Sequence, residues 1–420
     1  MNKGGKISSG NDIRFYGLSF AIVIILFRPR SINQYGSLDQ LFFMGQLLFA
    51  FALFAVAFFQ LVQKKEKAFS LIGWLVILYK LWETVAIYIN GHGDLSTIIA
   101  AANIIGATLF TELMLKRAPI EYLSTLSFYS GTMIFLNNMS YFYGGFGEVT
   151  DATGNVVYFW STRNHLSSLF FIALIASFII NGIKRTRAST LWNLFVALNV
   201  VWGTITFQSA TTIVGIASYL VMYYLFKKRT VLYQPVKLFF VGIGLNIAIV
   251  IFRIQQIFIF LIENLLNRTL TMSGRTLIWD TALLYIIRQP FWGYGQSSLF
   301  SFDFAATEIP AHNQFLDIAI ICGIPGMLLF MATLFVAFRA LRNYKNSLIA
   351  RIICCSLLAY IIMTITESPS PYQPWFILLG MVSLIPELEN QYTYIVYRLT
   401  GFGILTRTRM KGNIISLGGK

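Results

Sequence analysis

Arg275 and His312 are the two residues of this sequence best suited to bind an anion and to move a proton. Arg275 follows Ser273-Gly274, a helix-start signal, and opens a stretch that runs to Pro290. A guanidinium in the first turn of a helix, where free backbone N–H groups point outward, suits an anion such as phosphate. His312 opens an apolar run, and an imidazole in that place can take a proton from a hydroxyl near neutral pH.

Both residues also have plainer interpretations. An arginine at a helix start near a membrane is more often an anchor for lipid headgroups than a ligand for a substrate. A single histidine at a membrane boundary is more often a passive interfacial residue. Their occurrence together in one long segment favours the chemical role.

The segment that follows Arg275 predicts a short helix. Apolar residues recur there at helical spacing, and Trp279, four residues after Arg275, shares its face. About fifteen residues are too few to cross the roughly 30 Å hydrocarbon core of a bilayer. We therefore expect an amphipathic helix lying at the outer membrane interface, followed after Pro290 by a tight reversal at Gly293-Tyr294-Gly295.

The rest of the chain must position these residues, and its composition indicates a membrane protein. Of the 420 residues, 56% are hydrophobic and 12% are charged, whereas soluble domains carry roughly 25% charged residues. Apolar runs of about twenty residues recur from end to end, each long enough to cross a bilayer. The predicted fold is all-α, a polytopic transmembrane helical bundle of about 12 spans with a large outer loop that holds the amphipathic helix. The expected spans are 12–29, 38–62, 69–90, 97–115, 120–143, 166–183, 190–207, 210–226, 236–258, 313–338, 348–366 and 374–388.

Basic residues predict the orientation of this bundle. They gather at the ends of even-numbered spans, as at Lys64-Lys65-Glu66-Lys67 and Lys116-Arg117. Because positive residues stay cytoplasmic during insertion, both termini are expected inside. The apolar stretch 15–27 is followed at once by Arg28 without a small-residue cleavage site, which favours a retained first span over a signal peptide.

These spans divide the chain into four parts. They are an N-terminal transmembrane bundle (1–258), an extracytoplasmic catalytic loop (259–312), three C-terminal spans (313–388) and a basic cytoplasmic tail (389–420). A second outer loop, 144–165, is rich in glycine and aromatic residues.

Composition also excludes two classes of site. The net charge of +15 comes from residues at the ends of apolar runs and forms no continuous stripe, so no nucleic-acid partner is expected. Cys322, Cys354 and Cys355 lie in apolar runs, where cysteine behaves as a small hydrophobic residue. No metal site and no cofactor is expected.

The motifs of the outer loop resemble those of the O-antigen ligase and polymerase superfamily, over roughly residues 273–326. The shared order is Arg-(three residues)-Trp, then Pro-x-x-Gly-x-Gly, then His-Asn and a Gly-Ile-x-Gly turn. In this sequence these residues are Arg275, Trp279, Pro290, Gly293, Gly295, His312, Asn313, Gly323, Ile324 and Gly326.

The resemblance implies a metal-independent, inverting glycosyltransferase of the bacterial cytoplasmic membrane. It would act at the outer face on oligosaccharides carried by undecaprenyl diphosphate, with membrane lipid and a chain-length regulator as further partners. Arg275 would bind the diphosphate leaving group and His312 would be the base. Two arginines could stabilise the growing negative charge without a metal. The substrate-binding residues expected on this basis are Arg253, Arg268, Arg288, Trp279, Glu367, Asn313 and Lys80.

Some of these assignments leave alternatives open. Arg253 is the preferred second clamp, whereas Arg288 ends the short helix, where a cation also suits the helix dipole. Glu367 could bind sugar hydroxyls or orient His312. Lys80 lies inside the third span with Glu83 one turn on, either as a self-neutralising pair or on the substrate cavity.

Three functions fit the sequence. The first is a polymerase of oligosaccharide repeat units for a capsule, exopolysaccharide or O-antigen. The second is a ligase that moves a finished glycan to an acceptor. Ligases of this superfamily often carry a Ser-Arg pair where this chain reads Gln208-Ser209-Ala210-Thr211-Thr212, which favours the polymerase. The third is a lipid-linked sugar transporter, or flippase, although transporters place their site near the midplane and have no need for such a loop.

Overall fold

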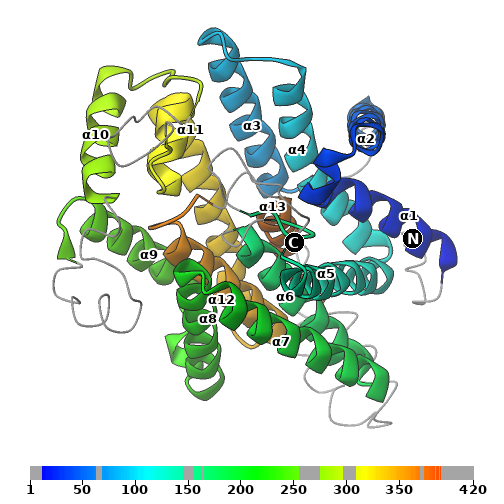
Figure 1. Ribbon diagram of the computed structural model, residues 1–420. Helices are drawn as coiled ribbons and strands as arrows, with labels where there is room; N and C mark the ends of the chain where they lie inside the picture. Colours follow the sequence, from blue (N-terminus) through cyan, green and yellow to red (C-terminus); the bar gives the residue numbers. More distant parts are fainter. Residues whose placement is uncertain are drawn as a thin grey trace, which may run out of the picture.

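The computed structural model describes residues 12–62, 69–144, 156–161, 165–254, 275–296, 309–368, 373–383, 385, 386 and 388. Every long element in these residues is a helix (Figure 1). The helices are α1 (Ile13–Leu26), α2 (Gly36–Val62), α3 (Leu71–Ile89), α4 (Leu95–Arg117), α5 (Pro119–Phe142), α6 (Leu166–Lys184), α7 (Arg187–Phe207), α8 (Ala210–Lys228), α9 (Pro235–Val250), α10 (Arg275–Arg288), α11 (Gln314–Leu341), α12 (Leu348–Met363) and α13 (Gln373–Val382).

The predicted all-helical fold is therefore confirmed, but the number of spans stays a prediction. Each of the twelve expected ranges contains a helix. Seven helices in the described part of the chain are long and apolar enough to cross a membrane, namely α2, α3, α4, α6, α7, α8 and α11. Four more, α1, α9, α12 and α13, are apolar but shorter. Residues 259–274 and 297–308 of the 259–312 loop and the whole 389–420 tail lie outside the described residues.

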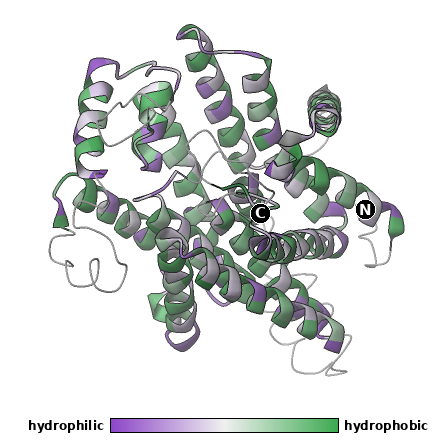
Figure 2. Cartoon of the chain, viewed as in Figure 1, coloured by the Kyte–Doolittle hydropathy of each residue, from purple (hydrophilic) through white to green (hydrophobic). Residues whose placement is uncertain are grey.

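The helices pack around a buried centre made by α6, α12 and α13. Nearly every residue of α12 and α13 is buried. α6 packs against α5 and α7, α13 against α4, α12 against α8, and α11 against α3. Large apolar side chains such as Leu48, Phe51, Leu198 and Ile205 remain exposed on outer helices, and Figure 2 shows hydrophobic residues along most helices, including peripheral ones. A surface of this kind suits contact with lipid.

Local sequence explains where several helices begin. Asp94 caps α4 through the backbone N–H of Thr97, and Thr186 caps α7 through Ser189, each in a reciprocal capping box. α5 and α9 begin with Pro119 and Pro235, whose missing N–H has no partner at a helix start anyway.

α11 is broken in its first half, and the break seats the turn that follows α10. Gly323 has a φ of 72° and Pro325 follows it, so helical hydrogen bonding is interrupted there. The N–H of Tyr294 donates to the carbonyl oxygen of Ile320 at 2.6 Å, and that of Gly295 donates to Ile321 at 3.0 Å. The broken helix thus has its free carbonyl groups satisfied by the turn.

Glycine is required on both sides of this contact. A Cβ on Gly293 would collide with the carbonyl oxygen of Ile320, and one on Gly323 would collide with that of Phe291. Both glycines also have positive φ, which L side chains rarely adopt. Two pieces of the sequence motif, Pro-x-x-Gly-x-Gly and Gly-Ile-x-Gly, therefore fit against each other and fix α10 beside α11 (Figure 1).

Candidate functional site

α10 carries Arg275 and is held against the start of α11 by one buried face. Ile278, Trp279, Ala282 and Ile286 are buried there against residues of α11. The indole N–H of Trp279 donates to the carbonyl oxygen of Ala311 at 3.0 Å. The helix therefore has the predicted extent and fixes where Arg275 lies, while its position at a membrane interface stays a prediction.

The residues just before α11 are pinned from both sides. The N–H of Ala311 donates to Asp317 Oδ1 at 2.8 Å. Asn313 caps α11, its Oδ1 accepting from the backbone N–H groups of Phe315 and Leu316 at 3.1 Å. His312 between them has a φ of 51°, a left-handed conformation that is uncommon for a residue with a side chain. Such backbone strain persists only where neighbouring contacts impose it.

Glu367 joins the two chemically important residues. Its Oε1 lies 3.5 Å from Arg275 Nη2, and its Oε2 lies 3.9 Å from His312 Nδ1. The Glu367 side chain is 14% exposed, against 21% for Arg275 and 32% for His312. A nearly buried carboxylate thus stands between a cation and an imidazole that both reach solvent.

The surroundings keep this carboxylate ionised. Burial raises the pKa of Glu367, but its interactions with His312, with the Arg275 guanidinium and with His165 lower the pKa by more, so that the net pKa lies below its ordinary value. Glu367 follows the end of α12, outside the helices that could span the membrane. At neutral pH it is therefore a negative charge that can orient both partners.

Arg253 lies beside the start of α10. Its Nη2 donates to the carbonyl oxygen of Thr276 at 3.0 Å and forms an ion pair with Asp280. The guanidinium also lies 5.4 Å from the centre of the Trp279 rings. Arg253 is thus close to Arg275 in space, but Asp280 already compensates its charge.

Two residues predicted to touch substrate lie inside the protein, where they hold neighbouring segments. Trp279 and Asn313 are both fully buried. The Asn313 Nδ2 donates to Asn246 Oδ1 at 2.9 Å and to the carbonyl oxygen of Ile365 at 3.2 Å, so its hydrogen-bonding capacity is used within the protein. Their place in the motif is explained by the way they hold α10 and α11 around Arg275 and His312.

The remaining predicted residues lie apart from this cluster or outside the described chain. Arg288 is exposed at the far end of α10, which places it about 20 Å along the helix from Arg275. Lys80 is 5% exposed and forms an ion pair with Glu83, the self-neutralising arrangement that the sequence left open. Arg268 lies outside the described residues.

Several residues that position the site were not predicted. Asp317 accepts from both Ala311 and the Ser368 hydroxyl, so one carboxylate ties the segment before α11 to the segment after α12. His165 acts on the charge of Glu367 from the start of α6. The hydroxyl of Thr211 lies 3.3 Å from that of Thr366, which brings the start of α8 beside the same segment. A signal for Asp317 was present, since an acidic residue in the first turn of a membrane helix needs a partner.

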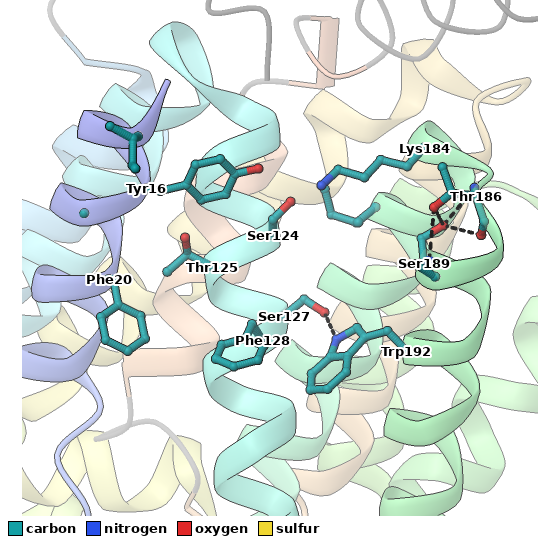
Figure 3. Close-up of a pocket in the computed structure, with 14 residues that line it drawn as sticks. Tyr16, Phe20, Ser124, Thr125, Ser127, Phe128, Lys184, Thr186, Ser189 and Trp192 are labelled. Carbon is teal, nitrogen blue, oxygen red and sulfur yellow. Dashed lines mark hydrogen bonds between the residues drawn. The ribbon is translucent and has the colours of Figure 1, made fainter. Parts of the chain in front are cut away.

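A cavity lies at the other end of α6, away from the cluster around Glu367. It has a volume of about 630 Å³ and is lined by residues of α1, α5, α6 and α7, where apolar side chains such as Phe20 and Phe128 alternate with hydroxyl groups, and Lys184 lies at one end (Figure 3). Several of its polar groups are already bonded, such as Ser127 to Trp192 at 2.9 Å and Thr186 to Ser189. α6 has 19 residues, so its two ends are roughly 28 Å apart. This cavity is therefore separate from the cluster around Glu367.

The fold and the cluster define a multi-helix membrane protein in which an arginine, a carboxylate and a histidine meet beside α10, α11 and α12. Residues 194–331 match the family model described as O-antigen ligase, and this match over part of the chain confirms the predicted resemblance. The matched region contains Arg253, Arg275 and His312 but ends before Glu367. A search of curated proteins found no match. The match supports an enzyme of the ligase or polymerase type.

Proposed function

We propose that this protein polymerises oligosaccharide repeat units carried on undecaprenyl diphosphate into a capsule, exopolysaccharide or O-antigen. The observation that carries the proposal is the contact of one nearly buried carboxylate, Glu367, with both Arg275 and His312. This cluster supplies a cation for a leaving group and a base for an acceptor within one site. Arg275 and His312 both lie in the region that matches the O-antigen ligase family, whereas Glu367 lies beyond it.

In the proposed reaction the acceptor hydroxyl attacks the anomeric carbon of the donor sugar. A new carbon–oxygen bond forms there while the bond to the diphosphate oxygen breaks, and the diphosphate leaves with the electron pair. His312 takes the proton of the hydroxyl, and Glu367 stabilises the resulting imidazolium. Arg275, at the start of α10, binds the departing diphosphate, where a guanidinium and the dipole of a helix N-terminus both attract negative charge. Attack from the face opposite the diphosphate makes the transfer inverting.

Arg253 is our proposed second contact for the diphosphate. It lies beside Thr276, next to Arg275 in sequence. Its Nη1 is buried without a hydrogen-bond partner among the described residues, which leaves one donor for a ligand. Because Asp280 already compensates its charge, we expect Arg253 to orient the diphosphate more than to neutralise it. Arg268 and Lys80 remain predictions for the same substrate.

Two other functions compete with the polymerase. A ligase would use the same cluster on a different acceptor, and the description of the matching family favours it. Against it, the start of α8 carries no Ser-Arg pair, although Thr211 there lies beside Thr366 in the structure. A flippase would need no such cluster of base and cation. We place the reaction at the outer face of the bacterial cytoplasmic membrane, with both termini inside.

The test is polymer formation in proteoliposomes that contain undecaprenyl-diphosphate repeat units as sole substrate, with no added metal. Wild type is compared with Arg275→Ala and His312→Ala. We expect a ladder of repeats from wild type and single units from both variants. If wild type makes no ladder but transfers a glycan to a separate acceptor, the ligase is correct. If both variants keep full activity, the cluster has no catalytic role and a transporter must be considered.

A further inference from the structure

A second cavity, of about 520 Å³, opens between the end of α1 and the starts of α2, α4 and α13. Its volume is in the range of small-molecule binding sites. Unlike the cavity near Lys184, it is lined by charged side chains of both signs and by amide side chains. The residues that matter to the argument are Arg28, Arg30, Asp39, Asn103, Trp160 and Ser161.

Three of these side chains carry buried polar atoms that lack a hydrogen-bond partner among the described residues. They are the Oδ1 of Asn103, the indole Nε1 of Trp160 and the hydroxyl of Ser161. The three side chains are 3%, 5% and 1% exposed. Buried polar groups are nearly always hydrogen-bonded, so three such groups around one cavity point to a partner that enters it.

The backbone around these side chains is held in place without such a partner. The N–H of Arg30 donates to the carbonyl oxygen of Trp160 at 2.8 Å. Asn137 Oδ1 accepts from the N–H groups of Trp160 and Ser161 at 2.8 and 3.3 Å. Arg28 pairs with Asp39 at 2.7 Å. The frame of the cavity is thus rigid, as a preorganised binding site requires.

The cavity adjoins the cluster around Glu367 through two short stretches of chain. Ser161 is four residues before His165, whose charge acts on Glu367. Gln373, which lines the cavity, is five residues after Ser368. At a maximum of about 3.6 Å per residue, these stretches reach no further than roughly 14 and 18 Å. The cavity therefore lies on the same side of the bundle as the cluster.

From these observations we infer that the cavity binds a segment of a glycan, through sugar hydroxyl groups. A sugar hydroxyl can donate to Asn103 Oδ1 and accept from the indole N–H of Trp160, and it can do either with Ser161. The ion pair of Arg28 and Asp39 offers further donors and acceptors without a large net charge. This inference rests on the proposed function for its ligand: the cavity would hold sugar units of a lipid-linked chain while its reacting end lies at His312.

Two variants remove the unpaired groups, and one control removes a paired group. Asn103→Leu and Ser161→Ala each delete a polar atom that has no hydrogen-bond partner in the described part of the chain. The matched control is Ser356→Ala, because the buried Ser356 hydroxyl already donates to the carbonyl oxygen of Ile352 at 3.0 Å. Binding is measured by calorimetry on the full chain in nanodiscs. The probes are the lipid-free repeat-unit oligosaccharide of the organism that encodes the chain and, separately, inorganic diphosphate.

We expect wild type to bind the oligosaccharide and the two cavity variants to bind it about fivefold to tenfold more weakly. The control should bind it like wild type, and the variants should not differ in their binding of diphosphate. In the ligand-free protein, Asn103→Leu and Ser161→Ala should raise the melting temperature, because each removes an unsatisfied buried group. Ser356→Ala should lower it or leave it unchanged.

Unchanged oligosaccharide binding in both cavity variants would overturn the inference. A lower melting temperature in both variants would also overturn it. Such a result would show that the polar groups already have partners in the ligand-free protein, for example water molecules in the cavity. A loss of diphosphate binding in the variants would indicate that the cavity binds the diphosphate of the lipid carrier, and this result would also contradict the inference. If binding behaves as expected but wild type transfers no sugar, the proposed function fails and the glycan site stands.

Discussion

Replacing Glu367 with glutamine keeps the shape of the side chain and removes its charge, so it isolates what the carboxylate does. Its Oε2 lies 3.9 Å from His312 Nδ1. When His312 takes the proton of the acceptor hydroxyl, the imidazole becomes positive beside this oxygen. A neutral amide cannot offset that charge, so the transition state loses stabilisation that the ground state does not need.

The size of the loss follows from the geometry. Two unit charges about 4 Å apart attract by about 4 kcal/mol at an effective dielectric constant of about 20. The His312 side chain is 32% exposed, and we take about half of this value, roughly 2 kcal/mol, to allow for solvent screening. Because about 1.4 kcal/mol of barrier changes a rate tenfold, kcat should fall about 30-fold.

The assay is glycosyl transfer in proteoliposomes with saturating lipid-linked repeat units, expressed per folded protein. Glu112→Gln is the matched control, since Glu112 is 1% exposed and its carboxylate accepts from Ser70 and Ser383, away from the cluster. The control should keep the kcat of wild type even if it folds less well. A Glu367→Gln protein whose kcat stays within about twofold of wild type would refute the electrostatic argument.

Three further changes test how the site is held. Trp279→Phe removes the hydrogen bond to the buried Ala311 carbonyl, which should cost about 1–3 kcal/mol of stability, seen as a lower melting temperature in detergent. Gly323→Ala places a Cβ against the Phe291 carbonyl at a φ of 72° and should cost at least about 1–3 kcal/mol; an unchanged melting curve would contradict the docking of the turn on α11. The folded pKa of Glu367 is depressed below its ordinary value of 4.5, so its ionised form stabilises the protein above about pH 4.5 and this stabilisation is lost as pH falls through the folded pKa. The difference in melting temperature between wild type and Glu367→Gln should accordingly shrink on acidification from pH 7.

Much of the architecture could be predicted from sequence because the apolar runs and the turn residues act locally. α10 ends before Pro290, and each expected span contains a helix. The glycine motifs that contain Gly293 and Gly323 can be recognised in the sequence, but the sequence does not show why glycine is needed at these positions. These two residues are thirty positions apart, and only the break in α11 shows that their backbones press against each other.

The site was harder to predict because its decisive contacts join distant segments. Arg275 and Glu367 are separated by 92 positions, and no periodicity relates them. The sequence left Glu367 with two possible roles, and the contact with His312 now favours the orienting one. The motif predicts Trp279 and Asn313 as substrate contacts, whereas their burial and their hydrogen bonds within the protein favour a positioning role. A motif marks residues that a site needs and does not separate those that react from those that support.

The contacts on both sides of His312, our proposed base, explain how its backbone conformation is held. A left-handed backbone at a histidine is unfavourable by itself, so neighbouring contacts must impose it. Ala311 on one side is bonded to both Trp279 and Asp317, and Asn313 on the other caps α11 and bonds to Asn246. Since Asp317 also holds Ser368, next to Glu367, the same buried carboxylate sets the positions of the base and of the group that orients it. Loss of Asp317 should therefore change the distance between His312 and Glu367, while the solvent exposure of each of these two residues changes little.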